Sequence, residues 1–255
     1  MDLYLLRNES PDLERNAIVR ASASSGEHAE AGRLQLERDR MEHLSGRGLT
    51  RLVLGEALGV EPASLRFARG AHGRPRLVDP DGSIDFNLSH TTGLIALLVG
   101  DRAVPFGVDV EDTRRRRGLQ VAEDFFAPSE ARAVELAAPS EADSVFLRTW
   151  TLKEAYIKAR GLGLAIPLDS FAFELGPPIR VSFTARCPVL PDGTSDAPSA
   201  WSFAAFTSGS HHIALAVRSP QLPGVRVFVV RGGRTIGDRL EQLSIEHLDA
   251  ASSDP

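Results

Sequence analysis

The chain has 255 residues, 42% of them hydrophobic, and a formal net charge of −5 at pH 7. This size allows one large domain or two small ones, and the slightly acidic charge argues against nucleic-acid binding. The single cysteine, Cys187, excludes a disulfide framework, while the longest aliphatic run, Leu94 to Val99, is too short to span a bilayer. The N-terminus lacks the apolar core of a signal peptide, so we expect a soluble cytoplasmic protein.

The first half of the chain predicts a strand, a helix and two hairpins. The strand begins at Leu3, and the helix spans about residues 43–58. A hairpin follows over residues 64–78, and "DPDG" makes the next turn. The stretch "SIDFNLSH" alternates apolar and polar residues as a half-buried strand does, and "LIALLV" after it is typical of a buried strand.

The second half repeats this order. It begins with "VPFGVDVED", followed by a short helix that Ser129 caps and by a long helix over residues 141–160 that ends at Gly161. "SFAFELG" repeats the earlier Ser-x-x-Phe strand, and "WSFAAF-TSGSH-HIALAVR" mirrors "SIDFNLSH-TTG-LIALLVG". Beyond residue 220, "VRVFVV" predicts an added strand and residues 237–251 a terminal helix.

This internal duplication predicts the fold class. We expect an α+β protein of two similar subdomains, residues 1–104 and 105–220, related by a pseudo-twofold axis, with residues 221–255 as a C-terminal extension. Ligands tend to bind at interfaces between domains, so the active site is expected in the crevice between the subdomains. The duplication also favours a monomer.

Two acidic residues share one face of the strand "FGVDVED". Alternate residues of a strand point to the same side, so Asp109 and Glu111 lie on one face while Val108 and Val110 lie on the other. Adjacent carboxylates repel each other unless a cation lies between them. The cation is either the arginine run at residues 114–117 or a bound ion.

The long helix carries a second polar stripe. Trp150, Glu154 and Lys158 lie four residues apart, and Lys153 flanks them. An exposed Glu–Lys pair of this kind is ordinarily surface decoration. However, these are the only two lysines among 29 basic residues, and a lysine ammonium is a compact charge suited to a phosphate oxygen.

The acids of the strand and of the helix together point to a metal ion. Asp109, Glu111 and Glu154 form an all-oxygen set, which fits Mg²⁺ better than zinc, with Mn²⁺ as an alternative. Because Mg²⁺ binds a few carboxylates together with substrate phosphates, the set predicts a diphosphate ligand.

Phosphate-binding residues are expected in the first half. Ser89 and His90 end the strand "FNLSH" in a turn whose amides and hydroxyls can face an anion. Arg74, next to a proline in "HGRPRL", is a further candidate. Arg47 at the first helix is another, and Arg51 lies one turn away from it.

These motifs resemble those of the Sfp-type 4′-phosphopantetheinyl transferases. "GVDVE", "FFAPSE" and "WTLKEAYIKARGLGL" follow each other in the family's order, after "HGRPRL" and "FNLSHTTG". The resemblance covers about residues 47–175 and implies a pseudo-dimeric α+β fold. It also implies an activity, the transfer of the phosphopantetheine arm of coenzyme A to a serine of an acyl, peptidyl or aryl carrier protein, with release of adenosine 3′,5′-bisphosphate.

The resemblance further implies a role for each candidate residue. Asp109, Glu111 and Glu154 would hold Mg²⁺ on the diphosphate, and Glu154 would also be the base for the carrier serine. Lys158 and Lys153 would neutralise phosphate charge. The remaining candidates would bind coenzyme A, with Arg74, Ser89 and His90 at the diphosphate and nearby groups and Arg47 at the 3′-phosphate.

Two other readings remain open. A Mg²⁺-dependent hydrolase of a nucleotide diphosphate would share the acids but would turn over coenzyme A with water alone. A non-enzymatic binding module would not need Asp109, Glu154 and Lys158. The arginines at 114–117 are expected to lie on solvated surface, with attraction of acidic carrier proteins as the alternative.

Overall fold

The chain divides into two compact units. In the computed structural model, the described residues are 1–9, 16–70, 72–80, 82–114, 119–190, 193–230 and 240–244. Unit 1 comprises residues 1–103 together with the strands that follow residue 225, and unit 2 comprises residues 104–224. The break thus lies between Ala103 and Val104.

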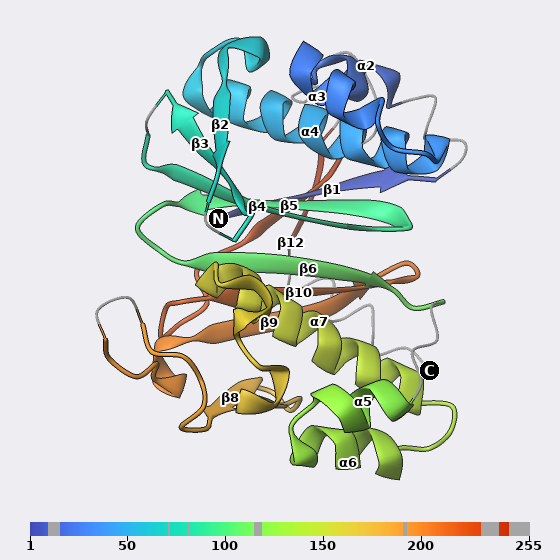
Figure 1. Ribbon diagram of the computed structural model, residues 1–255, viewed down its shortest axis with the longest axis vertical. Coiled ribbons are helices and arrows are strands. Elements are labelled where there is room, and N and C mark those ends of the chain that lie inside the picture. Colours follow the sequence, from blue (N-terminus) through green and yellow to red (C-terminus); the bar gives the residue numbers. More distant parts are fainter. Residues whose placement is uncertain are drawn as a thin grey trace. The chain divides into compact units, whose positions relative to one another are not determined.

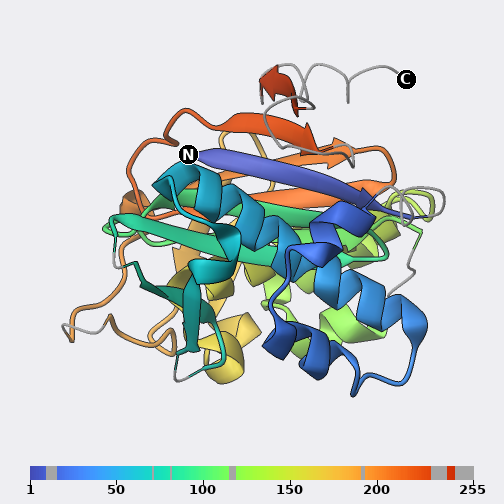
Figure 2. The ribbon, with the colours of Figure 1, turned by 90° about the horizontal axis from the view of Figure 1, so that it is seen from above.

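Unit 1 is built on a five-stranded sheet with the order β12-β11-β1-β5-β4. Its strands are β1 (Asp2–Asn8), β4 (Ile84–Thr91), β5 (Gly93–Asp101), β11 (Arg226–Val230) and β12 (Leu240–Ser244). β11 lies parallel to β1, the blue arrow at the N-terminus in Figure 2, and the other pairs are antiparallel. The predicted strand after residue 220 is therefore confirmed. The terminal helix expected over residues 237–251 is wrong at β12, and its other residues lie outside the described part.

The helices of unit 1 cover this sheet. They are α2 (Ala17–Ala21), α3 (Ser25–Ala31) and α4 (Glu37–Leu58), and a short 3₁₀ turn (Pro62–Ser64) leads into the hairpin of β2 (Arg66–Arg69) and β3 (Pro75–Asp79). α4 lies along the sheet in Figure 1 and buries Leu49 and Val53 in one core with Phe86, Ile95 and Leu97. The predicted helix over residues 43–58 is confirmed and begins earlier, whereas α2 and α3 were not expected.

Unit 2 contains a three-stranded antiparallel sheet with the order β6-β10-β9. The sheet consists of β6 (Phe106–Asp112), β9 (Ser202–Ser208) and β10 (His211–Val217). The helices are α5 (Leu119–Phe125), α6 (Pro128–Leu136) and α7 (Ala142–Arg160), and the second hairpin is β7 (Phe171–Glu174) with β8 (Arg180–Phe183). Short 3₁₀ turns lie at Gly163–Ala165, Leu168–Ser170 and Pro198–Ala200.

The long helix α7 forms the core of unit 2. Its apolar side buries Leu152 and Tyr156 against Phe171, Ala214 and Ala216. Small side chains on β10 let the helix approach the sheet closely, which brings functional groups of the two elements within reach of each other. As expected, α7 ends at Gly161, whose positive φ of 66° is readily adopted by glycine at this position.

The two units share one plan. In each, the first strand pairs with the second strand of a later hairpin, giving β1-β5-β4 in unit 1 and β6-β10-β9 in unit 2. Each also has one long helix and one separate two-stranded hairpin. This repetition agrees with the α+β duplication expected from the sequence. One detail is wrong: Ser129 lies inside α6, and it is the Glu130 carboxylate that accepts the Ala127 N–H (3.0 Å) at the start of that helix.

Candidate active site

The strand β6 and the helix α7 touch backbone to backbone at Gly107. A Cβ placed on Gly107 would lie 2.6 Å from the Ala159 nitrogen and closer still to the Ala155 oxygen. Only glycine fits there without moving the helix. Because Gly107, Asp109 and Glu111 alternate along β6, the face that meets α7 also carries the two acids.

Asp109 reaches the polar stripe of α7. Its Oδ1 atom lies 2.6 Å from the Lys158 Nζ atom, an ion pair whose side chains are 7% and 27% exposed respectively. Glu154 lies one turn before Lys158 on the same side of the helix, and it is half-buried. The structure therefore brings Asp109, which lies far from α7 along the chain, to the stripe that contains Glu154.

Glu111 lies farther along β6, towards the N-terminal half of α7. It pairs with His212 across the antiparallel ladder. Burial, reinforced by the positive charge of Arg148, lowers the pKa of His212 to about 4. Gly107 lies against Ala155 and Ala159 in the C-terminal half of α7, whereas Arg148, near His212, lies in its N-terminal half. β6 and α7 therefore run in opposite directions.

The arginine run contributes a different contact. The Arg114 Nε atom donates to both oxygens of Asp112, at 2.9 and 3.2 Å. Burial by itself raises the pKa of the Asp112 carboxyl, but the hydrogen bonds and charge of Arg114 outweigh it and leave that pKa below its usual value. Among the described residues, the run thus neutralises Asp112 while Lys158 neutralises Asp109. Residues 115–117 lie outside the described part.

Lys153 does not belong to the exposed stripe, which corrects the expectation that it contacts phosphate. Its side chain is 0% exposed, and its ammonium lies 2.7 Å from a Glu130 oxygen and 2.7 Å from each of the carbonyl oxygens of Leu168 and Phe171. An ammonium has three donors, and these three acceptors satisfy it. Burial lowers the pKa of Lys153 and raises that of Glu130, and in each case the charge of the partner opposes the shift.

Glu130 is the residue of this region that the sequence did not single out. It lies in "FFAPSE", a segment of the family resemblance to which no site role was assigned. Its position three residues after Ala127, with a proline at the first helical position, is typical of an acid that caps a helix. That pattern predicts the cap but not the ion pair with Lys153, which joins residues remote in sequence.

Arg47 of unit 1 lines a pocket of about 480 Å³. Arg66 and Arg69 also line it, together with the acids Glu27 and Glu30. The neighbouring candidate, Arg51, also lines this pocket, but its guanidinium is buried and donates to the Glu27 carboxylate and to the carbonyls of Pro62 and Leu65 (2.7–3.0 Å).

The other candidates of unit 1 lie on or near β4. Arg74 donates to Asp85 Oδ2 at 2.9 Å and to the Phe86 carbonyl at 3.1 Å, and burial lowers the pKa of its guanidinium despite the charge of Asp85. Ser89 is buried within β4. The exposed His90 ring has its Nδ1 atom 3.0 Å from Glu42 of α4, a contact that the sequence gave no means to find.

The donor chemistry of unit 2 fits a hard divalent cation. Asp109, Glu111 and Glu154 offer only carboxylate oxygens, which Mg²⁺ prefers. Asp109 already binds a cationic group, the Lys158 ammonium, on the side of β6 that meets α7. Among the residues that the structure describes, no group of three or more His, Cys, Asp or Glu side chains is gathered closely enough to hold a metal ion. The metal site therefore remains a prediction.

Profiles of known protein families match both halves of the chain. A family profile described as "4′-phosphopantetheinyl transferase, N-terminal" matches residues 10–101, and one described as "4′-phosphopantetheinyl transferase superfamily" matches residues 105–216. Across the described residues, no helix is long and apolar enough to cross a membrane.

Several curated proteins are similar to this chain. The 4′-phosphopantetheinyl transferase HetI of Nostoc sp. is 37% identical over 166 residues, which cover 64% of this chain and 69% of HetI. The 4′-phosphopantetheinyl transferase Sfp of Bacillus subtilis is 28% identical, with 76% and 84% covered. The L-aminoadipate-semialdehyde dehydrogenase-phosphopantetheinyl transferase of Mus musculus is 28% identical, with 80% and 69% covered.

Proposed function

The chain belongs to the 4′-phosphopantetheinyl transferase superfamily and is an enzyme of that type, and from this premise we propose how its residues act. We propose that it transfers the phosphopantetheine arm of coenzyme A to a serine of an acyl, peptidyl or aryl carrier protein. The serine oxygen forms a bond to the phosphorus next to the pantetheine, the bond from that phosphorus to the bridging oxygen breaks, and adenosine 3′,5′-bisphosphate leaves. The proton of the serine passes to a base on the enzyme.

The ion pair between Asp109 and Lys158 is the observation that carries this proposal. It joins β6 to α7 with an Oδ1–Nζ distance of 2.6 Å, one helical turn from Glu154. The carboxylates of Asp109, Glu111 and Glu154 would hold Mg²⁺, or Mn²⁺ in its place. Such an ion would neutralise charge on the diphosphate and align it.

The side chains around these acids have separate tasks. Glu154 accepts the proton of the carrier serine, directly or through a water molecule. Lys158 is 27% exposed, so its ammonium can exchange Asp109 for a phosphate oxygen and stabilise the charge of the leaving group. Lys153 has no part in this, because its three donors are already satisfied.

Unit 1 supplies the residues proposed for the rest of coenzyme A. Arg47 would bind the 3′-phosphate, supported by the other arginines that line its pocket. His90, Ser89 and Arg74 would bind the diphosphate and nearby groups. For Arg74 this requires sharing its guanidinium with Asp85, 2.9 Å away.

We further propose that the enzyme acts as a monomer in the cytoplasm, where a lone thiol such as Cys187 stays reduced. The repeated plan of the two units supports a single-chain enzyme, since one chain supplies both halves. An obligate trimer in sedimentation at micromolar concentration would contradict this.

The test is mass spectrometry of apo carrier proteins incubated with the enzyme, coenzyme A and Mg²⁺. We expect at least one carrier to gain a single phosphopantetheine group, and we expect both chelation and Glu154→Gln to abolish the gain. Glu174→Gln is the matched control, because it makes the same change in an exposed carboxylate on β7. Consumption of coenzyme A without any modified carrier would favour the hydrolase instead.

A further inference from the structure

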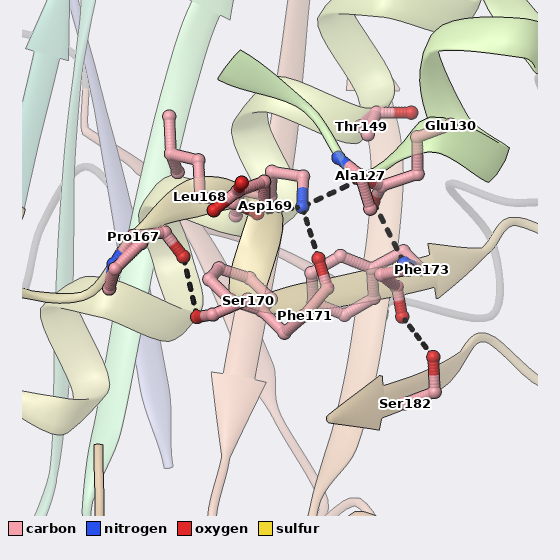
Figure 3. A network of polar contacts seen from close by, with 12 residues as sticks. Ala127, Glu130, Thr149, Pro167, Leu168, Asp169, Ser170, Phe171, Phe173 and Ser182 are labelled. Atoms are coloured by element: carbon pink, nitrogen blue, oxygen red, sulfur yellow. Dashed lines mark hydrogen bonds and ion pairs between the residues drawn. The ribbon is translucent and has the colours of Figure 1, made fainter. Parts of the chain in front are cut away.

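The strongest unassigned feature is the buried ion pair between Glu130 and Lys153, because it connects four segments of unit 2. One Glu130 oxygen accepts the Phe173 N–H of β7 at 2.8 Å, and the other accepts the Ala127 N–H of α6 at 3.0 Å and the Lys153 ammonium at 2.7 Å. Lys153 in turn donates to the carbonyls of Leu168, the first residue of the 3₁₀ turn before β7, and of Phe171, the first residue of β7. Figure 3 shows that the acceptor residues Glu130, Leu168 and Phe171, which come from separate segments, lie close together.

This site is built for a lysine rather than an arginine. Its acceptors match the three donors of an ammonium, whereas a guanidinium has five donors in a planar fork. The Phe171 ring centroid lies 4.2 Å from the ammonium and the Phe126 centroid 5.5 Å, so the space around the charge is closed by aromatic rings. This explains why lysine persists here in a chain whose other basic residues, Lys158 apart, are all arginines.

The position of Lys153 fixes the direction of its neighbours on α7. Successive residues of a helix are rotated by about 100°, so a side chain held in the core determines where the next one points. Glu154 follows Lys153 directly, and Lys158 lies one turn farther along the same side as Glu154. Rotation or sliding of α7 would break three contacts to Lys153 before Glu154 could leave the face that meets β6.

We propose that the Glu130–Lys153 pair is a positioning device for Glu154. The pair fixes the rotation of α7 about its axis and its position along that axis, so that Glu154 and Lys158 face Asp109. Lys153 itself contacts neither coenzyme A nor the carrier protein. The proposal rests on the function proposed above, in which Glu154 is base and metal ligand. It predicts that loss of the pair impairs the site in molecules that remain folded, in addition to any loss of stability.

The test compares variants that differ in which contact of α7 they remove. Lys153→Met and Glu130→Gln break the pair. Tyr156→Phe is the control, because it lies on the same helix and removes a buried hydroxyl that donates to Asp196 (2.9 Å) but leaves the pair intact. All are assayed well below their unfolding temperatures, for kcat with an apo carrier and for Mn²⁺ affinity in the presence of coenzyme A, measured by electron paramagnetic resonance.

A displacement of about 1 Å at a catalytic group costs on the order of 10²-fold in rate. We therefore expect both pair-breaking variants to lose kcat on this scale and to bind Mn²⁺ more weakly, while Tyr156→Phe stays close to the wild type in both. The proposal would be overturned if the pair-breaking variants and Tyr156→Phe had the same kcat and the same Mn²⁺ affinity at equal folded fraction. Failure of both pair-breaking variants to fold would also overturn it, since the pair would then act through stability alone. Absence of transfer by the wild type would refute the proposed function, and the Mn²⁺ affinities would still decide whether the pair positions the site.

Discussion

The two sides of α7 each carry a lysine paired with a carboxylate, and they differ in what surrounds the pair. On the core side, Lys153 lies 2.7 Å from Glu130 with side-chain exposures of 0% and 2%, and backbone carbonyls take its other donors. On the side facing β6, Lys158 lies 2.6 Å from Asp109, and 27% of its side chain reaches solvent. The distances are alike, but only Lys158 is accessible to a ligand.

This difference separates a charge that holds the fold together from a charge that can exchange partners. A buried charge is stable only while every partner is present, because removal of one leaves the other desolvated and unpaired. A partly exposed charge can be compensated by water when its partner leaves. Substitutions at four residues test this difference and the packing around it.

Lys153→Met should have the largest effect on stability. It leaves the Glu130 carboxylate buried without its cation, a change that costs about 3–5 kcal/mol. Lys153→Arg should also be costly, although it keeps the charge, because the enclosed site has no room for a guanidinium. Urea unfolding measures both. A Lys153→Arg variant as stable as the wild type would show that the site can accommodate a guanidinium.

Lys158→Gln should affect catalysis more than it affects stability. The amide can still donate to Asp109, but that carboxylate is only 7% exposed. We therefore expect a loss of stability smaller than that of Lys153→Met but larger than the roughly 1 kcal/mol of fully exposed ion pairs. The loss of a cation that stabilises charge in the transition state should lower kcat/KM by on the order of 10²-fold. Steady-state kinetics beside a urea curve checks both. Unchanged kinetics would remove Lys158 from the proposed mechanism.

Gly107→Ala tests the contact that brings the acids to α7. The added Cβ would lie 2.6 Å from the Ala159 nitrogen and closer to the Ala155 oxygen, so strand and helix must separate. Overpacking of this kind costs about 1–3 kcal/mol, and we expect activity to fall with it. Gly176→Ala is the control, since no atom lies within 4 Å of its added Cβ. Equal melting temperatures for the two variants would contradict the close packing.

The smallest expected effect is a pH dependence in unit 1. Burial, with the nearby charge of Arg47, lowers the pKa of His43 from 6.5. A group whose pKa is lower in the folded state takes up its proton more readily when unfolded, so stability is full above pH 6.5 and declines as the pH falls below it. His43→Gln should lessen this decline in melting temperature. A variant that declines as steeply as the wild type would exclude His43 as a cause.

Much of the fold follows from local patterns in the sequence, whereas the roles of the two lysines do not. Alternation along "FGVDVED" predicts that Asp109 and Glu111 share a face, and Gly161 predicts the end of α7; both agree with the structure. The four-residue spacing on α7 cannot separate the roles of Lys153 and Lys158, because only Lys153 contacts Glu130 and the carbonyls at the start of β7. Those partners are remote in sequence and have no periodic pattern.

Other errors have similar causes. The helix expected over residues 237–251 is wrong at β12 because pairing with β11 overrides the local helical pattern of Leu240–Ser244. Arg51 looks equivalent to Arg47 on the helix, yet its guanidinium binds Glu27 and two backbone carbonyls. A cation whose partners are backbone carbonyls cannot be recognised from the sequence. The sequence therefore suggests more ligand-binding cations than the structure leaves available.

Anomalous diffraction from crystals containing Mn²⁺ and coenzyme A tests whether Asp109 and Glu154 bind one divalent ion together. We expect a single strong peak about 2–2.5 Å from an oxygen of each residue, and loss of that peak in Glu154→Gln. Coenzyme A bound with no peak shared by these two carboxylates, or with the ion on other residues, would contradict this expectation.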